Sequence, residues 1–132
     1  MGRIAHAVAV STGGYAQQIR TGAHHLTADE PKSSGGTDTG PSPYGLLLSS
    51  LGACTSITLR MYAERKGWTL GEIKVDLSLI REGEAESIER ELRFSAPLAD
   101  EQRARLLEIA AKTPVTKTLS KGIRIDTQIR TS

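Results

Sequence analysis

The sequence has few aromatic residues and only one cysteine, Cys54. The aromatic side chains are one tryptophan, three tyrosines and one phenylalanine. Aliphatic residues must therefore form most of the core, and a second subunit that covers apolar surface would help a chain of this size. A single cysteine excludes an intramolecular disulfide and any metal site built on several thiolates.

The chain also lacks an excess of one charge and a long apolar run. Its 17 basic and 15 acidic residues are mixed along the sequence and give a net charge of +2. This balance argues against a dedicated nucleic-acid or membrane-surface protein. No stretch approaches the length of a membrane span, and the apolar run at the N-terminus is too short for a signal peptide. We expect a cytoplasmic protein that binds neither nucleic acid nor membrane.

Motifs for metals and cofactors are missing as well. The histidines are His6, His24 and His25, and no acidic cluster joins them at ligand spacing. The segment GGTDTG at 35–40 lacks the GKS/T ending of a phosphate-binding loop, so we interpret it as a flexible connector. We predict no metal and no cofactor.

The 132 residues predict one domain spanning 1–132. Ser42 and Pro43 are typical of a helix start, and Gly67 of a helix end, so a long helix is expected over 43–66. That helix is nearly uncharged until Arg60 and should be buried. The expected order is β-β-β-α-β-β-α-α-β, an α+β protein with antiparallel strands. The other elements are expected at 3–10, 14–21, 24–28, 73–79, 88–94, 99–112, 114–120 and 123–129.

Cys54 is the residue most able to carry chemistry, and two interpretations stay open. A thiol in an apolar helix is usually a small inert hydrophobe. A nucleophilic thiol needs a cation or a helix N-terminus near its sulfur. Arg20 and the helix that starts after Thr113 could supply them, whereas Arg60 faces mostly away from Cys54. Gly52, two residues before Cys54, would let another element or a substrate approach closely.

The segment from Gly40 to Trp68, with LGACTSITLRMYAERKGW as its most specific part, resembles the OsmC/Ohr hydroperoxide-reductase family. Asp29-Glu30-Pro31 ahead of it and KTPVTKTL at 112–119 resemble further family segments, and the similarity covers nearly the whole chain. It implies an intertwined homodimer in which antiparallel sheets wrap around long central helices. It also implies thiol-dependent reduction of organic hydroperoxides in oxidative-stress defence.

The resemblance assigns roles unevenly. Cys54 matches the cysteine that attacks the peroxide. Thr113 stands where the family has its resolving cysteine, and Gly45 stands at or beside the position of a pocket glutamate. Arg20 is the nearest candidate for the arginine that stabilises the thiolate and orients the peroxide. The expected activity is thus a one-cysteine mechanism that needs an external thiol or dithiol reductant. The alternative is a non-catalytic ligand-binding or redox-sensing stress protein in which Cys54 is structural.

Overall fold

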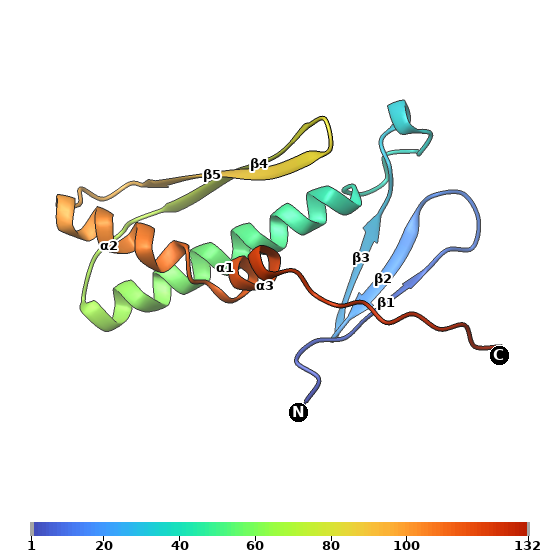
Figure 1. Ribbon diagram of the computed structural model, residues 1–132, viewed down its shortest axis with the longest axis horizontal. Coiled ribbons are helices and arrows are strands. Elements are labelled where there is room, and N and C mark those ends of the chain that lie inside the picture. The colour runs from blue at the N-terminus through green and yellow to red at the C-terminus, as the bar shows by residue number, and fades with distance from the viewer. Residues whose placement is uncertain (1, 132) are drawn as a thin grey trace. The chain divides into compact units, whose positions relative to one another are not determined.

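The computed structural model describes residues 2–131 as an α+β chain with antiparallel sheets and three α-helices (Figure 1). Up to the last helix, the element order is the one that the sequence predicts. The elements are β1 Ala7–Val10, β2 Gln17–Thr21, β3 His24–Ala28, a short 3-10 helix Lys32–Ser34, α1 Pro43–Lys66, β4 Ile73–Glu82, β5 Ala85–Phe94, α2 Asp100–Ala110 and α3 Pro114–Lys121.

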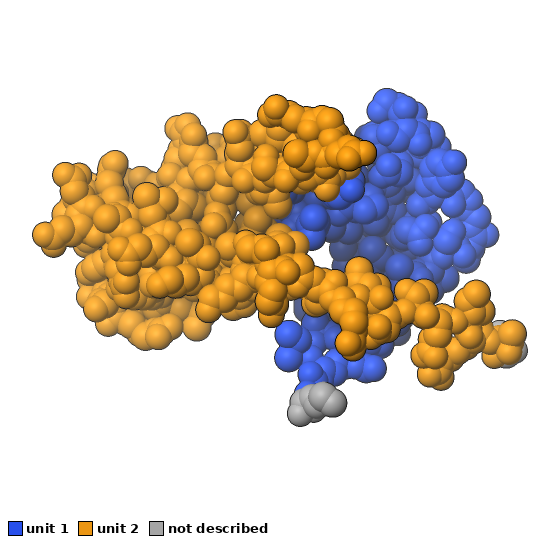
Figure 2. All heavy atoms as spheres, viewed as in Figure 1, with its two compact units in different colours: residues 1–49 blue, residues 50–132 orange. Residues whose placement is uncertain are grey.

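The chain forms two compact units, residues 1–49 and residues 50–132, which Figure 2 colours separately. The first unit holds a three-stranded antiparallel sheet in the order β1-β2-β3. Val8 pairs with Arg20 across β1 and β2, and Ile19 pairs with Leu26 across β2 and β3. The first strand begins four residues later than predicted and the second three residues later, the second because the polar turn between them takes more of the chain.

Helix α1 begins and ends where its capping residues predict. The Ser42 hydroxyl accepts a hydrogen bond from the Gly45 backbone N–H at 3.1 Å, which satisfies one of the free donors of the first turn. Gly67 follows the helix with φ +70°, the left-handed conformation that commonly ends helices. Within residues 2–131, no helix combines the length and the apolar character needed to cross a membrane.

The second unit is built around the C-terminal half of α1. The hairpin of β4 and β5 and the helix α2 pack their apolar faces against it, and Gly83 makes the tight hairpin turn with φ +62°. Because aromatic residues are scarce, aliphatic side chains fill the centre of this core, as expected. The buried members are Leu59, Ala63, Leu70, Leu106 and Ala110, with Tyr62, Trp68, Ile73, Leu92, Phe94, Leu98 and Ile109 around them.

The strand predicted at 123–129 does not form. Residues 122–131 have no helix or strand, and the three isoleucines that alternate along them are exposed by 71%, 81% and 95%. A strand is stable only when a neighbouring strand takes its backbone hydrogen bonds, and this single chain presents none to the segment. The alternating isoleucines that predict the strand are therefore not buried against any other part of the described chain.

The connector between β3 and α1 is ordered, so the prediction of a flexible loop is wrong. The buried carboxylate of Asp29 accepts hydrogen bonds from the hydroxyls of Thr37 and Thr39, both at 2.7 Å. It also accepts the backbone N–H groups of Glu30, Thr37 and Thr39 at 2.7, 3.3 and 3.1 Å. These bonds, led by the Thr39 hydroxyl, hold the pKa of Asp29 well below its usual range.

Asp29→Asn is expected to destabilise the first unit and to change its acid sensitivity. A depressed carboxyl pKa stabilises the fold above about pH 4, the unfolded value, and this stabilisation is lost as the pH falls below it. Thermal unfolding followed by circular dichroism from pH 7 to pH 3 should therefore show a lower Tm for the variant at pH 7 and a shallower acid decline. Asp38→Asn, in the same loop but exposed, is the matched control. Equal acid declines in Asp29→Asn and the unchanged protein would contradict the assignment.

Candidate active site

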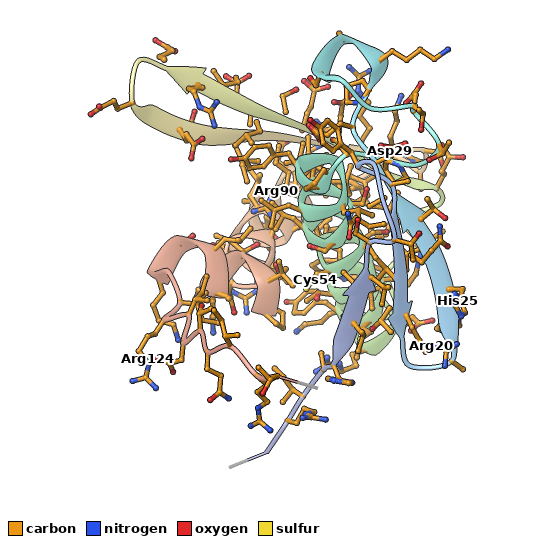
Figure 3. The ribbon with its side chains drawn as sticks, turned by 90° about the vertical axis from the view of Figure 1, so that its right-hand side faces the viewer. Arg20, His25, Asp29, Cys54, Arg90 and Arg124 are labelled. Atoms are coloured by element: carbon orange, nitrogen blue, oxygen red, sulfur yellow. The ribbon has the colours of Figure 1, made fainter. Side chains whose placement is uncertain are left out.

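Cys54 lies on α1 in the second unit, and its side chain is half-buried (Figure 3). Gly52 lies two residues before Cys54 on α1, and its lack of a side chain allows the β4–β5 hairpin to come close to the helix. A Cβ atom at position 52 would lie 2.9 Å from the Leu77 Cδ1 atom of β4. The close approach that the sequence predicts at Gly52 is thus made by the protein's own strand.

The N-terminus of α3 supplies a hydrogen-bond donor to the cysteine sulfur. The backbone N–H of Val115, the second residue of α3, donates to Cys54 Sγ at 3.5 Å. The first N–H groups of a helix have no partner within the helix and carry partial positive charge. The expectation that the helix after Thr113 directs amide groups at Cys54 is confirmed.

Arg90 is the cation of this site. It comes from β5, and Figure 3 labels it with Cys54. Its Nη1 donates to the Thr55 and Thr116 hydroxyls, both at 2.9 Å. Its Nη2 donates to the Ala110 carbonyl oxygen at the end of α2, also at 2.9 Å. One guanidinium therefore joins β5 to all three helices, through residues next to Cys54 and Val115.

Arg90 has no carboxylate partner in the part of the chain that the structure describes. The ion pairs there join other arginines to Glu86, Glu91, Glu108 and Asp126. Burial lowers the pKa of Arg90, and the negative charge of a Cys54 thiolate acts in the opposite direction. The guanidinium stays protonated at any ordinary pH, so the site keeps a positive charge beside the sulfur.

Thr113, the residue at the resolving-cysteine position, is completely buried. Its hydroxyl shares a hydrogen bond of 2.6 Å with the Thr116 hydroxyl, which also accepts from Arg90. Three polar residues are buried within residues 2–131, and two of them, Thr55 and Thr113, are at this site. The position therefore carries a fixed hydroxyl pair that cannot form a disulfide.

The remaining predicted site residues lie in the first unit. Arg20 is on β2, and its Nη2 lies 2.9 Å from His25 Nε2 on β3, a pair that Figure 3 also labels. Gly45 is the third residue of α1 and contributes its N–H to the helix cap. Among the described residues, no three histidine, cysteine or acidic side chains gather as a metal site.

Sequence analysis missed Arg90, although the pattern contains a signal for it. Ile88, Leu92 and Phe94 alternate along β5 and face the core, and Arg90 occupies the same face between them. A charged residue in such an apolar row is rarely buried without a specific partner. The partners are 26 and 35 residues away for Thr116 and Thr55, so the sequence does not reveal them.

The fold and this site together define an α+β protein whose one cysteine lies within a long helix, with its sulfur at the N-terminus of a second helix and beside a partly buried arginine. Residues 36–128 match the family described as OsmC-like protein, and the chain belongs to that family. No curated protein matches the chain at a significant level.

Solved structures of similar fold come from several bacteria. An osmotic stress induced and detoxification response protein from Psychrobacter arcticus is 15% identical, covering 89% of this chain and 90% of that one, with a TM-score of 0.77. The organic hydroperoxide resistance protein OsmC from Legionella pneumophila is 19% identical, covering 89% of each chain, with a TM-score of 0.65. OhrB of Bacillus subtilis is 23% identical, covering 88% and 90%, with a TM-score of 0.60. At these identities the likeness establishes the fold.

Proposed function

We propose that the protein reduces organic hydroperoxides in oxidative-stress defence, with Cys54 as its one redox-active cysteine. The observation that carries this proposal is the sulfur's environment. Cys54 Sγ accepts a helix N-terminal amide and lies beside a guanidinium that has no carboxylate partner among residues 2–131. Both features favour a thiolate, the form of cysteine that attacks peroxides. Two proteins of similar fold are named organic hydroperoxide resistance proteins, which supports the same chemistry.

The first step forms a sulfur–oxygen bond and breaks the peroxide bond. The Cys54 thiolate attacks the terminal oxygen of the hydroperoxide, the alkoxide leaves, and a proton from solvent converts it to the alcohol. The sulfur is oxidised to a sulfenic acid, and the hydroperoxide is reduced. The Val115 N–H and Arg90 remain as donor and cation beside the oxidised sulfur.

The second step needs a thiol from another molecule, because Thr113 offers only a hydroxyl. An external thiol condenses with the sulfenic acid to a mixed disulfide and releases water. A second thiol attacks that disulfide, restores the Cys54 thiol and leaves as the oxidised reductant. We place this reaction in the cytoplasm, where small thiols and dithiol proteins are kept reduced.

We propose an organic rather than an inorganic substrate. Helix α1 surrounds Cys54 with apolar residues, and Ile57 and Met61 of the same helix are exposed. An apolar hydroperoxide such as cumene hydroperoxide gains from contact with these groups, whereas hydrogen peroxide does not.

We also propose that the protein is a homodimer. Several large apolar side chains lie open in the single chain, on α1 and along residues 122–131. A second copy would cover such surface and offer the terminal segment the strand that it lacks. The exposed residues in these two regions are Tyr44, Ile57, Met61, Ile123, Ile125 and Ile129.

Cys54→Ser is expected to abolish hydroperoxide consumption, because serine cannot form a sulfenic acid. Cumene hydroperoxide would be added in limiting amount with a monothiol or dithiol reductant, and its loss followed against time. Dimedone trapping with intact-mass analysis should give one adduct in the unchanged protein and none in the variant. Equal consumption by both proteins would remove the proposal. Slow or absent trapping in the unchanged protein would favour a ligand-binding or structural role for Cys54.

Thr113→Cys is expected to convert the protein to a two-cysteine mechanism. One equivalent of cumene hydroperoxide should then remove both free thiols, form an intramolecular disulfide and suppress dimedone trapping. Loss of the Thr113–Thr116 hydrogen bond should lower the stability by about 1 kcal/mol. Thr118→Cys, an exposed position on the same helix, is the control and should retain dimedone trapping. Persistent trapping in Thr113→Cys would show that position 113 cannot reach the sulfur.

Ile57→Asp is expected to weaken the dimer, because a charge on the exposed face of α1 would be buried between two copies at high cost. Light scattering after size exclusion should give twice 14.2 kDa for the unchanged protein and a lower mass for the variant. Ile4→Asp, on the fully exposed N-terminal segment, serves as the control. A monomeric mass for the unchanged protein at micromolar concentration would contradict the dimer.

A further inference from the structure

We propose that Arg90 is the positioning residue of the site: its guanidinium compensates the charge of the Cys54 thiolate and fixes the two backbone segments that hold the sulfur. This inference rests on the proposed peroxide chemistry but names a residue that neither the sequence analysis nor the family resemblance assigned to the site. It assigns to β5 of the second unit a role that the sequence alone places on Arg20.

Arg90 is partly buried, and its hydrogen bonds supply no opposite charge. It faces inward from β5 between Ile88 and Leu92, and Leu77 is its cross-strand partner. Removing a guanidinium from water is unfavourable unless another charge or a full set of acceptors replaces the solvent. The acceptors present are three neutral oxygens, on Thr55, Ala110 and Thr116, for a group with five N–H donors.

The geometry connects those hydrogen bonds to the sulfur. Thr55 follows Cys54 on α1, and its hydroxyl is held by donating to the Leu51 carbonyl at 2.7 Å. Thr116 follows Val115, whose N–H reaches the sulfur. Cys54 and Val115 form the S···H–N contact, and Arg90 hydrogen-bonds to the residue that follows each of them, Thr55 and Thr116. A planar, forked guanidinium can hold two such hydroxyls and a carbonyl at once, which a lysine ammonium does less well.

The neighbouring charged residues that the structure describes have other partners or are exposed. On α1, Arg60 donates to the Gly71 carbonyl at 2.8 Å, away from Cys54. Lys112, before α3, and Lys117, within it, are exposed. At this level β4 presents Leu77 to the helix, through its contact at Gly52. The negative charge of a Cys54 thiolate would raise the pKa of Arg90, so the two groups interact electrostatically.

The test is the pH profile of Cys54 alkylation by iodoacetamide, which requires no peroxide. Only the thiolate reacts, so the midpoint of the profile reports how strongly the site favours the negative charge. Arg90→Met should move the midpoint upward and slow alkylation below the midpoint by about tenfold or more, the effect of removing an opposite charge at close range. Arg90→Lys, which keeps the charge, should recover most of the rate.

Three further variants separate charge from packing. Arg93→Met removes an exposed arginine of the same strand and should leave the profile unchanged. Thr116→Val removes one acceptor but no charge, so it should lower the Tm with little effect on the midpoint. Arg90→Gln provides a neutral side chain that still donates hydrogen bonds, and its shift decides the question should Arg90→Met fail to fold.

Two outcomes would overturn the inference. One is a profile in Arg90→Met or Arg90→Gln that coincides with that of the unchanged protein. The other is a shift in Thr116→Val as large as that in the arginine variants, which would make the effect one of packing. An Arg90-dependent midpoint in a protein that consumes no hydroperoxide would retain the inference and reject the proposed function. An alkylation profile that is the same in the Arg90 variants, in a protein that does reduce hydroperoxides, would reject the inference and retain the proposed function.

Discussion

The guanidinium of Arg90 is the interaction on which the second unit's site depends. Among the described residues it bonds to α1, α3 and the end of α2 together, and it does so from the face of β5 that also carries Ile88, Leu92 and Phe94. Thr55 and Thr113 are buried, and their hydroxyls are satisfied inside the same network. A buried polar network holds its parts in one arrangement only while every member has a partner. The position of the sulfur relative to the Val115 amide is therefore set by hydrogen bonds as well as by apolar packing.

Thr113 and Thr116 place a pair of hydroxyls, and no second thiol, at the start of α3. A cysteine at position 113 would stand at the start of the same helix whose amide reaches Cys54. Threonine there has the extended conformation before Pro114 and shares a hydrogen bond with Thr116. The consequence is chemical, because an oxidised Cys54 has no thiol of its own chain to condense with.

Local signals were enough to predict the frame of the fold. Ser42, Pro43 and Gly67 act through the helix caps, so each is decided within a few residues. The start of α3 at Pro114 is also a local signal, and it was enough to suggest a helix N-terminus near Cys54. Arg90, the ordered loop around Asp29 and the missing last strand could not be predicted in this way. The first two depend on partners brought together by folding, and the third depends on a strand that the single chain does not supply.

Asp29, which is buried, and Arg90, which is partly buried, show how structural and chemical roles can be separated. Asp29 accepts five hydrogen bonds, and they lower its carboxyl pKa, which means that its surroundings stabilise the charged form. All five donors lie in the connector between β3 and α1, so the role of Asp29 is to stabilise that loop. For Arg90 the lowered pKa means the opposite, since burial destabilises the charged form and only the Cys54 charge acts against this. Arg90 thus differs from Asp29, because its hydrogen bonds go to neutral oxygens and the charge that would compensate it lies on the neighbouring sulfur, an arrangement typical of reactive sites.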